Sequence, residues 1–146
     1  MIERPQYTVD ELAALQTAYE RAIYEVYWGD KTIPLRIGQC CPQLDTLIIQ
    51  HGLNFWALIT AHNPYSQCLS ASENQQHHRQ LIEHLQKLKL PYLPAVGKDA
   101  NGIWTPEASF CIFGLELDRA IAIGQKFNQN AIVYGKLNQL VGLQWL

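Results

Sequence analysis

Two runs of apolar residues constrain the fold of this chain most, Phe55–Ala61 and Ala108–Gly114. Both are apolar at nearly every position rather than at alternate positions. A strand with this pattern has both of its faces covered, so it lies inside a sheet and not at an edge. The two runs therefore predict the central strands of a mixed structure.

The other elements follow from helical or strand spacing, capping residues and prolines. Thr8 and Glu11 fit a capping box at the start of the first helix, and Pro34 and Pro94 place two strands at sheet edges. In chain order we predict a helix from Val9 to about Val26, a strand over 32–37, a short helix over 42–50, the strand 55–61, a helix from Ser72 to about Lys89, a strand over 92–97, the strand 108–114, a helix over 116–127, a strand over 130–134 and a short strand over 142–146.

From Phe55 onward these elements follow the order β-α-β-β-α-β. This order is typical of the ferredoxin-like fold, in which the first and third strands are the inner ones. The two doubly apolar runs are the first and third strands of this unit. The sequence thus predicts an α+β protein, a ferredoxin-like β-α-β-β-α-β sandwich over 53–146, with a helix and an edge strand over 1–52 as an extension of one single domain, 1–146.

This topology gathers most of the polar chemistry of the chain at one end of the sheet. The loop after the strand 55–61, the hairpin after the strand 92–97 and the starts of the last two strands all lie there. Loops and strand ends held by a rigid sheet commonly carry binding sites. The residues that we expect to meet are His62, Asn63, Ser66, Lys98, Asp99, Trp104, Glu107, Ser109, Gln129 and Asn130.

The expected function is the binding of a small polar or anionic ligand at the C-terminal end of the strand 55–61. Glu107 and His62 are the candidate catalytic residues, because a carboxylate or an imidazole can move protons. The candidate ligand-binding residues carry amide, hydroxyl or ammonium groups: Asn63, Ser66, Lys98, Ser109, Gln129 and Asn130. No metal site is predicted, because no histidine pair has suitable spacing.

Each of these residues also has a purely structural interpretation. Asn63 before Pro64 favours a turn, Lys98 and Glu107 could form an exposed ion pair, and His62 could be an ordinary partly buried histidine. The alternative function is therefore a non-catalytic interaction or regulatory module, with homo-oligomer formation as one form of it. Whether the protein is an enzyme stays open.

The composition disfavours several classes of partner. The chain has 146 residues with a formal net charge of −2 and no run of lysine or arginine, which disfavours nucleic-acid binding. Its apolar runs are too short to span a bilayer, and Met1–Pro5 does not resemble a signal peptide. We expect a cytoplasmic protein without a membrane partner.

The cysteines and the short motifs suggest no cofactor. Without an export signal, the four cysteines are expected to be reduced thiols, at positions 40, 41, 68 and 111. The chain contains no P-loop, no dinucleotide-binding glycine motif and no zinc-protease motif.

Several words of the sequence resemble an uncharacterised bacterial domain family of unknown function. That family carries a T-A-x-N-P word, a later E-x-S-F word and a closing F-x-Q-N-A word. The matching words here are Thr60-Ala61-His62-Asn63-Pro64, Glu107-Ala108-Ser109-Phe110 and Phe127-Asn128-Gln129-Asn130-Ala131. The resemblance covers roughly Leu58 to Gly135 and implies no particular activity.

Overall fold

The computed structural model describes residues 2–146. It is a mixed α/β protein, with four α-helices, one 3₁₀ turn and seven strands in the described residues. The elements are α1 (Val9–Arg21), β1 (Ile23–Trp28), β2 (Lys31–Leu35), α2 (Pro42–Gln50), β3 (Phe55–Thr60), η1 (Pro64–Ser66), α3 (Ala71–Leu88), β4 (Tyr92–Lys98), β5 (Glu107–Phe113), α4 (Leu117–Lys126), β6 (Ala131–Lys136) and β7 (Gly142–Trp145).

All seven strands form one antiparallel sheet in the order β2-β1-β4-β5-β3-β6-β7. The two apolar runs, β3 and β5, pair with each other inside the sheet, as the sequence indicated. The prediction that β4 is an edge strand is wrong, because β1 pairs with its free side. That pairing ends at Val26 opposite Ala95, one residue before Pro94, which has no N–H to continue it.

The second error of the sequence prediction concerns the first helix. The capping box of Thr8 and Glu11 is present, but α1 ends at Arg21 and the chain enters strand β1 at Ile23. In β1 the buried side chains alternate, with Tyr24 and Val26 inward. The apolar residues of Ile23–Trp28 are compatible with both a helical and a strand spacing. The segment forms a strand because its backbone pairs with β2 and β4. Similarly, α3 begins after the capping box of Ser70 and Glu73, not at Ser72.

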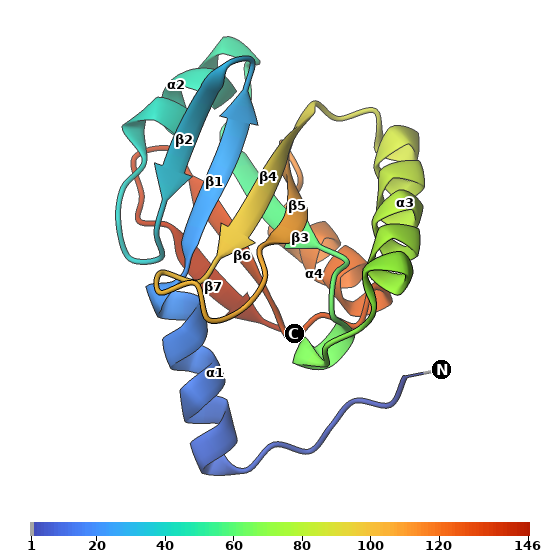
Figure 1. The fold of residues 1–146 in the computed structure, drawn as a ribbon. Coiled ribbons are helices and arrows are strands. Elements are labelled where there is room, and N and C mark those ends of the chain that lie inside the picture. Colours follow the sequence, from blue (N-terminus) through green and yellow to red (C-terminus); the bar gives the residue numbers. More distant parts are fainter. Residues whose placement is uncertain (1) are drawn as a thin grey trace.

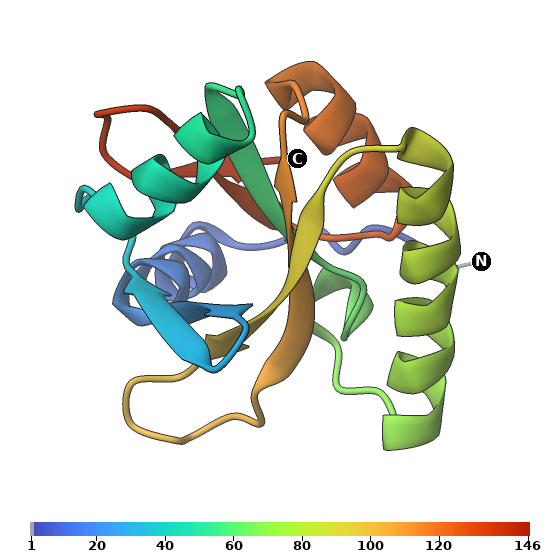
Figure 2. The ribbon, with the colours of Figure 1, turned by 90° about the horizontal axis from the view of Figure 1, so that it is seen from above.

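The sheet is covered on both faces. Helices α3 and α4 pack on one face, which we call the α3/α4 face, against residues such as Ile59 and Ile112. The other face, the α1/α2 face, carries Leu58 and Cys111 and packs against α2. Figures 1 and 2 show α3 and α4 together on one side of the sheet, with α1 and α2 on the other. The alternation of side chains along each strand therefore divides the core into two clusters.

Helix α1 differs from the other three helices because none of its residues is buried. It lies at one end of the sheet, apart from α2 (Figure 1). A few specific contacts join it to β7: Trp145 Nε1 donates to Gln16 Oε1 at 2.6 Å, and the Tyr19 and Trp145 rings meet edge to face at 5.6 Å. Helix α1 therefore covers part of the α1/α2 face without being built into the core.

Candidate functional site

A cavity of about 250 Å³ lies between α1 and the α1/α2 face of the sheet. We call it the α1 cavity. Helix α1 supplies one wall. Strands β1 and β3 to β7, the loop after β3 and the β4–β5 hairpin supply the others. Its polar and aromatic lining consists of Tyr19, Tyr24, Thr60, Asn63, Ser66, Cys68, Trp104, Glu107, Ser109 and Gln129. Five of the eight candidate site residues are in this list, from three separate parts of the chain.

The loop after β3 has an unusual backbone. Asn63, Tyr65 and Ser66 all have positive φ angles, of 46°, 52° and 59°. Residues other than glycine rarely adopt positive φ angles. Several such residues in one loop are found where the surrounding structure enforces the backbone conformation. Here the Tyr65 backbone N–H donates to the Asn128 carbonyl at 2.7 Å, and the Tyr65 hydroxyl donates to Asn128 Oδ1 at 3.1 Å. The segment before β6 thus fixes the shape of the loop.

Asn63 is the best-connected residue of this loop. Its Oδ1 accepts hydrogen bonds from the Leu69 backbone N–H at 3.0 Å and from Asn74 Nδ2 at 2.9 Å. Its own backbone N–H donates to Asn74 Oδ1 at 2.8 Å. Two donors on Oδ1 leave Nδ2 free to donate to Glu107 Oε1, at 3.1 Å. Asn63 therefore positions the Glu107 carboxyl rather than standing open to a ligand on all sides.

Glu107 is the first residue of β5, opposite Gly97 of β4. Its side chain lines the α1 cavity and is largely removed from water. Burial raises the pKa of the carboxyl above its ordinary value of 4.5, and the hydrogen bond from Asn63 opposes part of that rise. An acid with this environment is easier to protonate than an exposed glutamate.

Three other polar side chains of the cavity have their donors engaged by the protein. Gln129 Nε2 donates to the His62 carbonyl at 3.1 Å and to the Phe127 carbonyl at 3.2 Å. The hydroxyl of Thr60 donates to the Ala108 carbonyl at 2.8 Å. The hydroxyl of Ser109 donates to the carbonyl of Glu107 at 3.0 Å. The Thr60 hydroxyl also accepts from the His62 backbone N–H at 3.0 Å, so it keeps one lone pair, whereas Gln129 Oε1 and the Ser109 hydroxyl oxygen are free to accept.

Ser66 and Asn130 meet beside the cavity, although only Ser66 lines it. Asn130 is buried, and its Nδ2 donates to Ser66 Oγ at 3.0 Å and to the Tyr7 hydroxyl at 2.9 Å. The Tyr7 hydroxyl in turn donates to the Tyr65 carbonyl at 2.9 Å. Asn130 thus fastens the N-terminal segment to the loop after β3, which is a structural role.

Tyr19 and Tyr24 are cavity residues that the sequence did not single out. Burial raises the pKa of both phenols, and hydrogen bonding with Ser66 opposes part of the rise at Tyr19. The Tyr19 phenol and then the Glu107 carboxylate raise the pKa of Tyr24 further, and Glu107 also adds to the rise at Tyr19. Tyr24 was hidden because its segment was assigned to a helix. The concentration of β-branched and aromatic residues in Ile23–Trp28 is the signal that could have identified a strand there.

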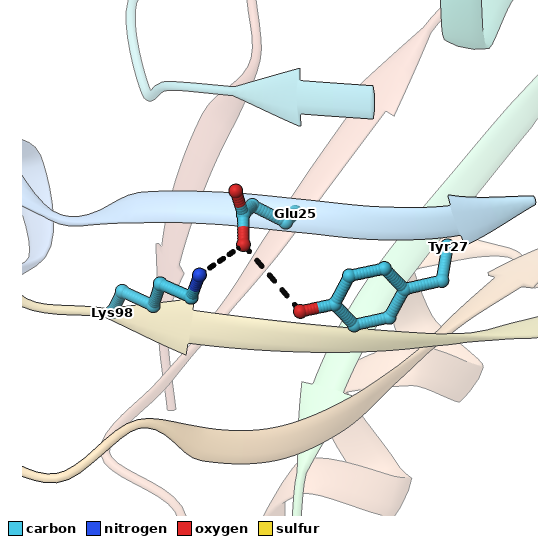
Figure 3. Close-up of polar contacts among 3 residues, drawn as sticks. All are labelled: Glu25, Tyr27 and Lys98. Carbon is cyan, nitrogen blue, oxygen red and sulfur yellow. Dashed lines mark hydrogen bonds and ion pairs between the residues drawn. The ribbon is translucent and has the colours of Figure 1, made fainter. Parts of the chain in front are cut away.

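The structure separates Lys98 from the cavity. Its ammonium group pairs with Glu25 on β1, with 2.5 Å between Lys98 Nζ and Glu25 Oε1, and the Tyr27 hydroxyl donates to the same oxygen at 3.4 Å. Figure 3 shows this group of three side chains. Successive strand residues point to opposite faces, so Lys98 points away from the cavity that Gly97 lines. The hydrogen bond to Glu25 raises the pKa of Lys98, and the ion pair is partly exposed to solvent.

His62 is also turned away from Glu107. Its ring meets the His78 ring edge to face at 5.7 Å, and the His78 ring stacks on Phe110 at 4.8 Å, on the α3/α4 face. Burial lowers the pKa of His62, and the neighbouring His78 and His77 lower it further. The backbone of His62 reaches the site: its carbonyl accepts from Gln129, and its N–H donates to the Thr60 hydroxyl at 3.0 Å. The two candidate catalytic residues therefore lie on different faces of the sheet.

Two larger hollows lack the predicted residues. One, of about 320 Å³, follows the groove between α3 and α4, and another, of about 490 Å³, lies beside the C-terminus. Both are more open to solvent than the α1 cavity, and neither contains a candidate site residue. Within residues 2–146, no group of three or more histidine, cysteine, aspartate or glutamate side chains could hold a metal ion. All four cysteines are free thiols, and Cys68 lines the α1 cavity.

None of the helices in the described part of the chain combines the length and the apolar composition needed to cross a membrane.

The chain belongs to a family of proteins of unknown function, DUF3293, whose model matches residues 59–132. This match confirms the family resemblance. It includes Asn63, Glu107 and Gln129, whereas Tyr19 and Tyr24 precede it. Comparison with curated proteins and with solved structures found no match.

Proposed function

We propose that this family member binds a small molecule in the α1 cavity, with Glu107 as its polar anchor. The observation that carries the proposal is the position of the Glu107 carboxyl in the cavity wall, where Asn63 alone donates a side-chain hydrogen bond to it within residues 2–146. Burying a carboxyl with so few partners costs stability. A cavity that keeps such a group is a candidate binding site.

The lining of the α1 cavity argues against an anionic ligand, which was one of the sequence-based expectations. Glu107 is the one carboxylate among the described residues that line the cavity, and none of those residues is lysine, arginine or histidine. Lys98, the expected anion partner, is paired with Glu25 on the other face. The ligand is therefore neutral or cationic.

Proton transfer is the chemistry that Glu107 could add to binding. A raised pKa brings a carboxyl nearer to neutral pH, where it can both accept and release a proton. The two hydrogen bonds with Asn74 would fix Asn63, and Asn63 would in turn hold the Glu107 carboxyl in one orientation. A protein that only binds the ligand and an enzyme that also transfers a proton both have to bind it first. The experiment therefore tests binding.

A fragment screen by NMR tests this proposal. We expect binders to shift the amide signals of β5 and of the loop after β3, together with the indole signal of Trp104. Ala18 lies on the exposed helix α1 and lines the cavity, so Ala18→Phe should fill the space and abolish those shifts.

The matched control is Ala14→Phe, an exposed position of the same helix outside the cavity lining. Ala14→Phe should leave binding unchanged. Binders that shift only signals of α3 and α4, or that ignore Ala18→Phe, would contradict the proposal.

The alternative proposal is an interaction module that pairs through a sheet edge. The edge strand β2 carries the exposed residues Lys31 and Pro34, which are typical of edges protected against pairing. The structure thus offers this proposal less support. Light scattering across a range of concentrations tests it, and a constant monomer mass would contradict the homo-oligomer version.

We also propose that the unit from β3 to β6 is ferredoxin-like. Its strand order β4-β5-β3-β6 has the first and third strands of the unit inside, and α3 and α4 lie on one face. Strands β1 and β2 on one side and β7 on the other extend it.

A further inference from the structure

The hydrogen-bonding groups that face the α1 cavity are mostly acceptors. Gln129 has committed Nε2 to two backbone carbonyls, which leaves Oε1 as its free group. Thr60 and Ser109 have committed their hydroxyl hydrogens to carbonyls in the same way. The Glu107 carboxylate accepts by nature, and its Oε2 has no side-chain partner among the described residues.

A smaller set of donors faces these acceptors. Asn63 keeps one hydrogen on Nδ2 after its bond to Glu107, and Ser66 accepts from Asn130 and keeps its hydroxyl hydrogen. Trp104 adds its indole N–H and Cys68 a weakly donating thiol. The phenol of Tyr19 can turn its hydrogen toward either side. A ligand with several N–H groups would satisfy the acceptors, whereas a ligand rich in acceptors would leave them unpaired.

The remaining lining suits an organic cation with an apolar body. Tyr19, Tyr24 and Trp104 are aromatic residues, and aromatic rings attract cations. Leu58 and Leu143 supply aliphatic surface. An apolar cavity of roughly 150 Å³ can hold one benzene ring. The α1 cavity, at about 250 Å³, has room for such a ring with a short polar arm.

We infer that the ligand of the α1 cavity is a small primary amine, bound as its ammonium ion with Glu107 as counter-ion. This inference rests on the proposed function and specifies the ligand class. The three N–H groups of the ammonium would donate to the Glu107 carboxylate and to the neighbouring acceptors of Gln129 and Thr60. Charge-assisted bonds of this kind are stronger than bonds between neutral groups.

Three probes of similar size and shape separate the possible ligand classes: benzylamine, benzyl alcohol and benzoate. We would titrate each into the protein at fixed pH and follow the amide signals by NMR. Benzylamine should bind at least about tenfold more tightly than benzyl alcohol, because only the amine forms charge-assisted bonds. Benzoate should bind most weakly, because its charge repels Glu107.

Glu107→Gln provides the variant test, with Glu25→Gln as the matched control. Both changes remove one carboxylate, but Glu25 pairs with Lys98 outside the cavity. Glu107→Gln should reduce the affinity for benzylamine by about tenfold or more and leave that for benzyl alcohol nearly unchanged. Glu25→Gln should change neither.

Equal binding of benzylamine and benzyl alcohol, or stronger binding of benzoate, would overturn the amine inference on the wild-type protein alone. So would the absence of any benzylamine shift at the cavity. Each of these results leaves the broader proposal intact if fragments of another class bind the cavity and are displaced by Ala18→Phe. Failure of that screen would overturn both.

Discussion

At the scale of single residues, the cost of burying Glu107 should be visible in the pH dependence of stability. Its pKa is raised in the folded state, so folding is favoured when the carboxyl is protonated. That contribution is complete below the unfolded-state pKa and is lost as the pH rises through the folded-state pKa. We therefore expect Glu107→Gln, which stays neutral, to be more stable than the wild type at neutral pH.

The difference should shrink as the pH falls through the raised folded-state pKa of Glu107, and it should be gone below the ordinary carboxyl value of 4.5. Urea unfolding at several pH values measures it. Glu25→Gln is again the comparison, because the Glu25 carboxylate is satisfied by Lys98. A Glu107→Gln variant that is less stable at neutral pH than at acidic pH, relative to the wild type, would contradict this account.

Asn63 gives a second prediction at this scale. Asn63→Ala removes the acceptor for Leu69 and Asn74, and it removes the one side-chain donor to Glu107 that residues 2–146 contain. Leaving such groups unpaired typically costs about 1–3 kcal/mol for each buried one. We expect the free energy of unfolding to fall by about 2 kcal/mol or more, measured by urea unfolding.

The partner residue provides the control. Asn63 and Asn74 exchange two hydrogen bonds, so the double variant Asn63→Ala/Asn74→Ala should lose less than the sum of the single variants. Additive losses would mean that Asn63 acts independently of α3.

At the scale of elements, α1 should be the least protected helix. None of its residues is buried, and its side chains are joined to β7 through Gln16, Tyr19 and Trp145. Elements with few buried contacts open without global unfolding. Hydrogen exchange followed by mass spectrometry should show faster exchange in α1 than in β3 and β5.

Trp145→Phe removes the hydrogen bond to Gln16 and should accelerate exchange in α1 alone. Trp28→Phe is the same change in a residue at the far end of β1, and it should have no effect on α1. If α1 were as protected as β3, it would be part of the core, and the cavity would be closed to ligands.

Local patterns predicted the elements well where one signal dominated. The continuous apolar runs of β3 and β5 have no competing interpretation, and their inner positions followed from the burial of both faces. The stretch from Leu15 to Val26 carries two compatible spacings, and only its pairing with β2 and β4 resolves them. Pro94 was misread because a proline bars pairing at its own position but not over the rest of the strand.

At the scale of the whole molecule, the predicted meeting of candidate residues is found where it depends on the β3–β5 pairing. The contact of Asn63 with Glu107 joins the ends of these two neighbouring strands. Lys98 and His62 were expected at the site, but their side chains point to the other face of the sheet. The face to which a side chain points depends on the exact register of its strand. Lys98 also depends on β1, which was not predicted to be a strand, and its partner Glu25 could not be anticipated.

The two core clusters, on opposite faces of one sheet, lead to the last prediction. Leu44 of α2 is fully buried on the α1/α2 face, and Leu85 of α3 is almost fully buried on the α3/α4 face. Each change to alanine should cost about 2–5 kcal/mol, through lost burial and the resulting void. Because both clusters pack on the same strands, both variants should show one cooperative transition at a lower urea midpoint with an unchanged slope.

Circular dichroism and tryptophan fluorescence should report the same midpoint. If Leu44→Ala instead produced an early transition confined to residues 2–52, with β3 to β6 still folded, the N-terminal part would be a separable unit and the single-domain prediction would be wrong.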